Sequence, residues 1–214
     1  MNSIALHHVV PHVFAQHTQL ESDIWNNDIS FEKGKKYLVL ADSGQGKSSL
    51  CGFLMGYRRD YDGDIAFDGV NIRQLSVSDW CSVRQQQMAY LFQELRLFPE
   101  LTARENVEIK NILSASTTNE QIALWFQRLG IEDKMDAKVG HMSFGQQQRV
   151  ALIRALAQPF DFLLLDEPIS HLDDGNAAVM AEVMMEEVER KGAAVIVTSI
   201  GKHMMLDYDI TYHL

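Results

Sequence analysis

The chain is poor in cysteine and proline, and it has no hydrophobic run long enough to cross a bilayer. Among its 214 residues are four prolines and two cysteines, Cys51 and Cys81. Two cysteines without a paired spacing exclude a disulfide framework and a cysteine zinc site, and they favour a reducing compartment. No apolar run approaches ~20 residues, and the start MNSIALHHVV lacks the basic and apolar regions of a signal peptide. We therefore expect a cytoplasmic protein that does not itself span a membrane.

Positive charge is also scarce, because 19 Lys and Arg residues face 29 Asp and Glu residues, which gives a formal net charge of −10. A protein that binds nucleic acid normally carries a basic face, so we expect no nucleic-acid partner. His7, His8, His12 and His17 are scattered without ligand spacing, and we expect no metal site from them. The hydrophobic share of 46% is enough for one ordinary globular domain.

The pattern of apolar residues predicts alternating strands and helices. Strands are expected at SIALHHVV, NDISF, KYLVLA, DIAFDGVNI with a hairpin at Asp68-Gly69, MAYLF, FLLL, AAVIVTS and DITYHL. Helices are expected at 47–56, from about Gly145 to before Pro159, and at 174–191. Strands that alternate with helices indicate an α/β fold with a parallel sheet.

Residues 94–142 form a different, mainly helical segment. Thr102 with Glu105 and Thr117 with Glu120 each fit the capping box that opens a helix. After the second box, an apolar helical face is formed by Ile122, Trp125, Phe126 and Leu129, and Gly130 fits the helix end.

The segment ADSGQGKSSL, residues 41–50, follows a buried-type strand and precedes a helix. It matches the phosphate-loop pattern except that Ala41 stands at the first glycine position. Gly44 and Gly46 allow the backbone to aim N–H groups at phosphate, Lys47 supplies positive charge, and Ser48 can hold Mg²⁺. The alternative is a plain turn between strand and helix. We expect nucleotide contacts from Ala41, Asp42, Ser43, Gly44, Gln45, Gly46, Lys47, Ser48 and Ser49.

Two adjacent carboxylates, Asp166 and Glu167, end the apolar strand FLLL. Ligands bind at the carboxyl ends of parallel strands, so Asp166 is placed to orient Mg²⁺ and Glu167 to polarise an attacking water. Alone, this pattern is more often a helix start. Together with an upstream phosphate loop it predicts nucleotide hydrolysis.

The segment MSFGQQQR, residues 142–149, stands before a helix that leads to the acidic strand. With it, essentially the whole chain resembles the ATP-binding cassette (ABC) ATPases, whose signature is Leu-Ser-Gly-Gly-Gln. Gln93 matches the family's glutamine loop, and residues 170–173 (SHLD) match the loop after the acidic strand. The resemblance implies one phosphate-loop NTPase domain over 1–214. Its parts would be an α/β core with an N-terminal antiparallel β subdomain (1–92 and 145–214) and a helical subdomain (93–144).

The resemblance also implies site roles. Two copies would close head to tail around two ATP molecules, a homodimer being preferred to a heterodimer. Ser143, Gly145 and Gln146 would face the ATP of the partner, and Asp173 would cross the interface. Catalysis would involve Lys47, Gln93 and Glu167, and Mg²⁺ would be held by Ser48, Gln93 and Asp166. Phe14 is the candidate for stacking on adenine, with His12 as the reserve.

Three positions depart from the family pattern. Ala41 replaces a glycine, Phe144 replaces the first signature glycine, and Ser199 stands where a histidine would contact the γ-phosphate. His203 could substitute for that histidine, although an unrelated surface histidine is the preferred interpretation. We expect ATP to bind and drive dimerisation while hydrolysis is slow.

The stretch FQELRLFPELTARENV, residues 92–107, resembles the subgroup that serves lipoprotein release, macrolide export and cell division. This implies a separately encoded membrane permease, with the ATPase held on the inner face of the cell membrane. Leu97, Phe98 and Leu101 would line its docking groove or pack inside the helical segment. A regulatory ATP switch without transport is the first alternative, and a soluble ATPase of DNA repair or translation is the second.

Overall fold

The larger of two β-sheets is parallel and has the strand order β6-β7-β8-β3-β9. The computed structural model describes residues 1–15 and 21–214. The parallel strands are β3 (Lys36–Leu40), β6 (Met88–Leu91), β7 (Phe162–Asp166), β8 (Ala194–Ser199) and β9 (Ile210–His213). Every residue of β7 and β8 is buried, as is typical of parallel strands that are covered on both faces.

The smaller sheet is antiparallel, with the order β2-β1-β4-β5. Its strands are β1 (Ser3–Pro11), β2 (Asp28–Glu32), β4 (Tyr61–Phe67) and β5 (Val70–Asn71). The predicted hairpin is confirmed: Asp68 and Gly69 have φ angles of 48° and 82°, and they join β4 to β5. Positive φ at both central residues is the requirement of a tight hairpin turn.

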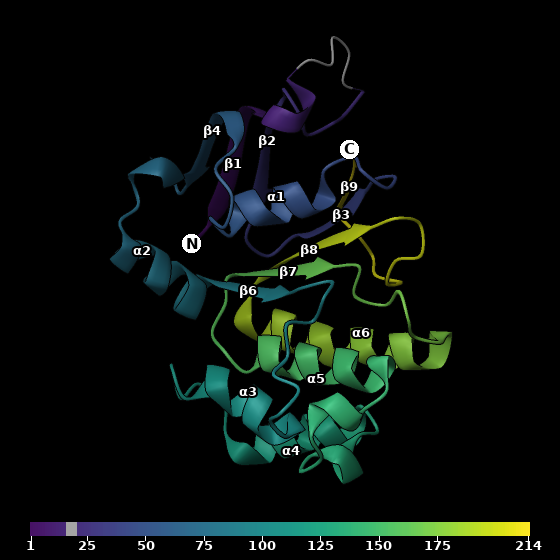
Figure 1. Cartoon of the computed structure of the whole chain (residues 1–214). Helices are drawn as coiled ribbons and strands as arrows, with labels where there is room; N and C mark the ends of the chain where they lie inside the picture. Colours follow the sequence, from purple (N-terminus) through teal and green to yellow (C-terminus); the bar gives the residue numbers. More distant parts are fainter. Residues whose placement is uncertain (16–20) are drawn as a thin grey trace.

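Helices cover both faces of the parallel sheet. Helix α1 (Lys47–Leu54) lies between the two sheets, and α5 (Phe144–Leu156) and α6 (Asp174–Lys191) cover the opposite face (Figure 1). Alternate strand residues enter two cores, because successive side chains of a strand point to opposite faces. Leu164 and Ile196 join the core around α1, whereas Leu163 and Val195 join the core around α5 and α6.

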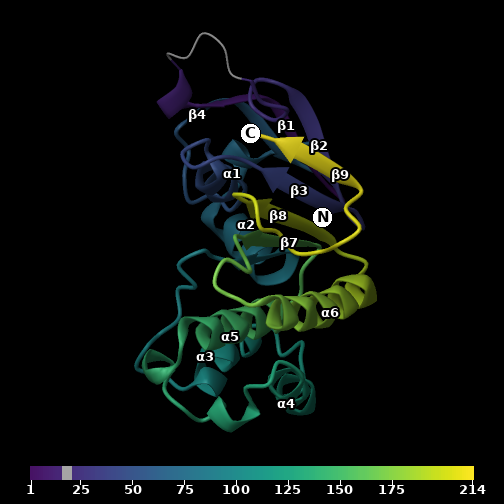
Figure 2. The same ribbon diagram turned by 90° about the vertical axis from the view of Figure 1, so that its right-hand side faces the viewer.

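The helical segment extends below α5 and α6 and contains α3 (Ala103–Asn111) and α4 (Asn119–Arg128) (Figure 2). The capping box at Thr102 and Glu105 is confirmed. The expected face of α4 is buried as well, since Ile122, Trp125, Phe126 and Leu129 are all at most 2% exposed.

The second predicted capping box is wrong by one residue. Thr118, not Thr117, caps α4, and its side chain accepts a hydrogen bond from the N–H of Gln121. Thr117 is held in the preceding loop, because its N–H donates to Asn111 Oδ1 and its carbonyl accepts from Asn111 Nδ2.

The sequence patterns did not predict one of the helices. Helix α2 (Val77–Ser82) follows a capping box of Ser76 with Asp79, and a π-helical turn (Val83–Gln87) continues it. Short 3-10 turns occupy His12–Phe14, Ile72–Gln74, Glu132–Lys134 and Val139–His141. Within residues 1–15 and 21–214, no helix is both long and apolar enough to span a membrane.

Candidate active site

The phosphate loop joins the end of β3 to the start of α1. Gly44 and Gly46 have φ angles of +87° and +98°, a backbone region that glycine adopts without strain. Gly46 is the N-cap of α1 and gives no side-chain cap, so the first N–H groups of the helix are left for a ligand. Ala41 is not among the residues with positive φ, and therefore its methyl group adds no backbone strain there.

Three charged residues meet beside this loop. Lys47 is 6% exposed, and its Nζ lies 3.4 Å from the carbonyl oxygens of Ala41 and Asp42. The same Nζ lies 3.8 Å from Glu167 Oε1. Asp166 and Glu167 are adjacent in the chain, so one buried ammonium group and two carboxylates are concentrated at one edge of the sheet.

Asp166 is held by hydroxyl groups on both carboxylate oxygens. Thr198 Oγ1 donates to Oδ1 at 2.6 Å, and the Tyr90 hydroxyl donates to Oδ2 at 3.3 Å. Burial raises the pKa of Asp166, and the two hydroxyl groups and the charge of Lys47 oppose that rise. Burial also raises the pKa of Tyr90.

Glu167 has a φ angle of +49°, which is uncommon for a residue with a side chain. The strained backbone is held because the Glu167 N–H donates to the Thr198 carbonyl at 3.0 Å. The buried side chain of Gln148 also donates to the carbonyls of Glu167 and Pro168. Strain that the surrounding structure maintains is typical of functional positions.

The other residues predicted for this part of the site differ in their surroundings. Ser48 is exposed, whereas Ser49 is buried and its hydroxyl accepts a hydrogen bond from Arg58 at 2.8 Å. Gln93 is exposed two residues beyond β6, and β6 pairs with β7 in the register Leu91 to Leu165. Gln93 therefore leaves the sheet at the edge where Asp166 ends β7.

Phe14 lies against the phosphate loop. A Cβ atom at Gly46 would come within 3.1 Å of Phe14 Cε2 and within 3.1 Å of Trp25 Cζ2. His12, the reserve for adenine stacking, instead pairs with Asp62 at 3.4 Å. The contact between Trp25 and Gly46 was not predicted, because no sequence motif links Trp25 to the phosphate loop.

A second group of predicted residues gathers at the starts of α5 and α6. Ser143 caps α5 and forms a capping box with Gln146, and Asp173 caps α6. A Cβ atom at Gly145 would lie 3.2 Å from Leu172 Cδ2, so these two helix starts are in contact. Across residues 1–15 and 21–214, no hydrogen bond or ion pair joins Ser143, Gly145, Gln146 or Asp173 to the phosphate loop.

Phe144, the first residue of α5, contacts the segment that leads into α6. Its ring is 41% exposed and packs on His171, with ring centroids 4.4 Å apart. The bulky residue at the first signature glycine position therefore lies against the loop that follows the acidic strand.

Ser199 ends β8 beside the phosphate loop, since the N–H of Ala41 donates to its carbonyl at 3.1 Å. The side chain of Ser199 is buried, and its hydroxyl donates to the Lys202 carbonyl at 2.7 Å.

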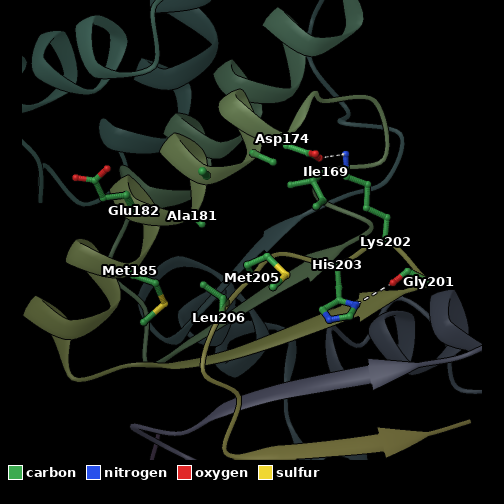
Figure 3. A pocket seen from close by; sticks show the side chains of 12 residues that line it. Ile169, Asp174, Ala181, Glu182, Met185, Gly201, Lys202, His203, Met205 and Leu206 are labelled. Carbon is green, nitrogen blue, oxygen red and sulfur yellow. Dashed lines mark hydrogen bonds and ion pairs between the residues drawn. The ribbon is translucent and has the colours of Figure 1, made fainter.

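His203 lies in a groove of 620 Å³ between α6 and residues 201–206. Figure 3 shows its ring bonded to the carbonyl of Gly201, with Nδ1 and that oxygen 2.8 Å apart. The groove is otherwise mainly apolar and includes Ile169, Met185 and Leu206.

Among the residues that the structure describes, no group of three or more His, Cys, Asp or Glu side chains is arranged to hold a metal ion. Of the four scattered histidines, His17 lies outside the described residues. The oxygen donors expected for Mg²⁺ nevertheless fit that ion, since a serine hydroxyl, an amide and a carboxylate are hard ligands.

Comparisons with known proteins agree with this geometry. The protein-family model described as "ABC transporter" matches residues 25–170. The lipoprotein-releasing system ATP-binding protein LolD of Legionella pneumophila (strain Lens) is 29% identical over 80% of this chain and 77% of its own length. The macrolide export ATP-binding/permease protein MacB of Hyphomonas neptunium is 32% identical over 78% of this chain. The chain spans only 26% of that longer relative.

The fold matches solved cassettes. A dimeric structure of the ATP-binding cassette MJ0796, in a post-hydrolysis state bound to ADP and Pi, superposes with a TM-score of 0.76. That match has 25% sequence identity and covers 92% of this chain and 87% of the other. The phosphate loop, the acidic strand end and the matched family model lead to one conclusion: this chain belongs to the ABC transporter family and is an ABC-type ATPase.

Proposed function

We propose that the protein binds and hydrolyses ATP to power or gate a separately encoded membrane permease, through ATP-driven dimerisation. The observation that carries the proposal is the contact of Lys47 Nζ with Glu167 Oε1 at 3.8 Å, next to Asp166 and the phosphate loop. A buried cation at the loop suits the terminal phosphates of ATP, and a carboxylate beside it suits activation of water.

Each residue of the loop has a distinct part in this proposal. The N–H groups of Gly44, Gly46 and the first turn of α1 bind phosphate oxygens, and Lys47 neutralises the phosphate charge. Glu167 accepts a proton from the attacking water. Mg²⁺ would be held by Ser48, Gln93 and Asp166, and when bound it would neutralise further phosphate charge. Phe14, beside Gly46, would stack on the adenine ring.

The starts of α5 and α6 would act on the ATP of a second copy. Ser143, Gly145, Gln146 and Asp173 lie at the touching starts of these helices, and within residues 1–15 and 21–214 none of them forms a hydrogen bond with the phosphate loop of its own chain. A head-to-tail dimer would give them a ligand. The dimeric MJ0796 cassettes support such an assembly, and a homodimer needs only this chain.

Slow turnover is part of the proposal. The buried hydroxyl of Ser199 is already committed to the Lys202 carbonyl, and a serine is too short to place a donor on the γ-phosphate. The variant Ser199→His is expected to raise steady-state hydrolysis at least about tenfold, by analogy with the loss caused by removing one transition-state donor. ATP-dependent dimerisation, measured by gel filtration, should change little.

One result would argue against slow turnover, and another against the whole proposal. A wild type that already hydrolyses ATP rapidly, with no gain in Ser199→His, would refute slow turnover. The variant Glu167→Gln serves as the control, because it should abolish hydrolysis and trap the ATP-bound dimer. If wild type binds no ATP, the whole proposal fails.

The membrane partner is proposed from the relatives, whose names describe lipoprotein release and macrolide export. The protein would then work on the cytoplasmic face of the cell membrane. Leu97, Phe98 and Leu101 would contact the permease: Phe98 is 50% exposed, whereas Leu97 is half-buried and packs against the core around α5 and α6. Affinity purification from detergent-solubilised membranes tests this, with Phe98→Ser expected to release the partner.

A regulatory ATP switch without transport is a second candidate, favoured by Ser199. Normal ATP-dependent dimerisation with very slow hydrolysis, together with no substrate movement by the reconstituted complex, would favour it over transport.

A further inference from the structure

The indole ring of Trp25 lies directly behind the phosphate loop. Trp25 is 2% exposed, and its Nε1–H donates to the carbonyl oxygen of Gln45 at 3.1 Å. The residue precedes β2, and its own backbone N–H donates to Ser22 Oγ at 2.9 Å. Its ring also packs edge-on against Phe53 of α1, with centroids 6.2 Å apart. The ring is therefore held by packing in the core as well as by its hydrogen bond to the loop.

The same ring covers the next residue of the loop. A Cβ atom built at Gly46 would lie 3.1 Å from Trp25 Cζ2 and 3.3 Å from Trp25 Nε1. These distances are so short because the Gln45–Gly46 peptide rests on the indole. Only glycine combines that close approach with the φ angle of +98° found at this position.

Anchoring the Gln45 carbonyl also determines where the Gly46 N–H points. A trans peptide unit is planar, and its C=O and N–H bonds point in opposite directions. Because the carbonyl points at Trp25, the Gly46 N–H points away from the indole. This N–H belongs to the N-cap residue of α1, where the helix leaves donors for an anion.

We propose that Trp25 is a positioning residue for nucleotide binding: its indole N–H fixes the Gln45–Gly46 peptide so that the Gly46 N–H faces the phosphates of bound ATP. The inference rests on the proposed function. Trp25 acts through the backbone of the loop and does not touch the nucleotide.

The test separates the donor from the ring. Trp25→Phe keeps an aromatic ring in the core but removes the N–H. We expect the Kd for ATP and the KM for hydrolysis to rise about threefold to tenfold, the net worth of one hydrogen bond, with kcat nearly unchanged. Because the effect concerns phosphate, the Kd for tripolyphosphate should rise by the same factor.

A second variant covers the case in which Trp25→Phe fails to fold. Replacement of Trp25 by 3-benzothienylalanine puts sulfur in place of the indole N–H at nearly constant shape. It should raise the Kd for ATP and for tripolyphosphate as much as Trp25→Phe does. Trp125→Phe is the matched control: Trp125 is also 2% exposed but lies in α4. It should lower stability without changing either Kd.

Fluorescence provides an independent readout. ATP should change the emission of wild type and of Trp125→Phe, and this change should be lost in Trp25→Phe, in which Trp80 and Trp125 remain.

Unchanged Kd values in both Trp25 replacements would overturn the inference and leave the proposed function intact. An equal loss in Trp125→Phe would also overturn it, since the effect would then be general destabilisation. A wild type that binds no ATP would overturn the proposed function and this inference with it.

Discussion

Replacing Thr198 by valine removes the hydroxyl group that donates to Asp166 while it preserves the branched shape of the side chain in β8. Thr198 is fully buried, and its Oγ1 lies 2.6 Å from Asp166 Oδ1. Asp166 is itself only 2% exposed, so water cannot replace the lost donor without a local opening of the structure. Valine and threonine both favour strands, and the backbone of β8 should therefore be unaffected.

The magnitude follows from the charge and burial of the acceptor. A hydrogen bond to a charged group contributes about 1.5–3 kcal/mol, and loss of a donor to a buried group lies toward the upper end. The Tyr90 hydroxyl, 3.3 Å from the other oxygen, is beyond the usual O–H···O distance and compensates little. We expect Thr198→Val to lower the free energy of unfolding at pH 7 by about 2–3 kcal/mol.

The effect should depend on pH in one direction. Burial raises the pKa of Asp166, and the Thr198 hydroxyl opposes that rise by stabilising the carboxylate. The contribution of this hydroxyl is therefore present when Asp166 is ionised and is lost as the pH falls through the folded-state pKa. The difference in stability between wild type and Thr198→Val should shrink under acid conditions.

Urea denaturation of wild type, Thr198→Val and Thr198→Ser measures these effects. Serine restores the hydroxyl and should recover most of the stability, and ATP hydrolysis should fall in the valine variant because Asp166 loses its orientation. If Thr198→Val is as stable as wild type, or if serine loses as much as valine, the reasoning about Asp166 is refuted.

Two further predictions concern the fold. Gly63→Ala should lower the free energy of unfolding by at least about 3 kcal/mol, because the φ angle of Gly63 is +85° and a Cβ there would lie 2.4 Å from the carbonyl oxygen of His8. Gly192→Ala should lower it by only about 1–2 kcal/mol, because Gly192 has a φ angle of +58° but open space around it. Equal losses in urea denaturation would contradict the steric argument. Burial opposes ionisation of Asp161, but hydrogen bonds from Lys33 and the N-terminal amine outweigh it and lower the carboxyl pKa. Asp161→Asn should therefore lower the free energy of unfolding by about 1–3 kcal/mol at pH 7, and this difference from wild type should vanish as the pH falls through the lowered pKa. A difference that stays constant with pH would refute the argument from the charge of Asp161.

Parts of the site that are contiguous in the chain were predictable. The phosphate loop, the acidic pair and the signature segment each lie within ten residues, so residue type and spacing are enough to indicate their chemistry. The same holds for α6, whose predicted and observed bounds agree.

Local patterns failed where a tertiary contact selects between similar residues. Thr117 and Thr118 both precede α4, and the two hydrogen bonds between Thr117 and Asn111 leave Thr118 as the cap. Helix α2 has six residues, which is too short for helical periodicity to appear in the sequence.

The sequence by itself determined the family, the phosphate-loop motif and the order of all the longer strands and helices, because these depend on residues close together in the chain. Only the tertiary structure decided what holds the site in place. Trp25 reaches Gln45 across 20 residues, Thr198 reaches Asp166 across 32, and Tyr90 reaches Asp166 across 76. No periodicity or motif encodes such separations. They arise when parallel strands bring their carboxyl ends to one edge and Trp25, just before β2, packs behind the loop.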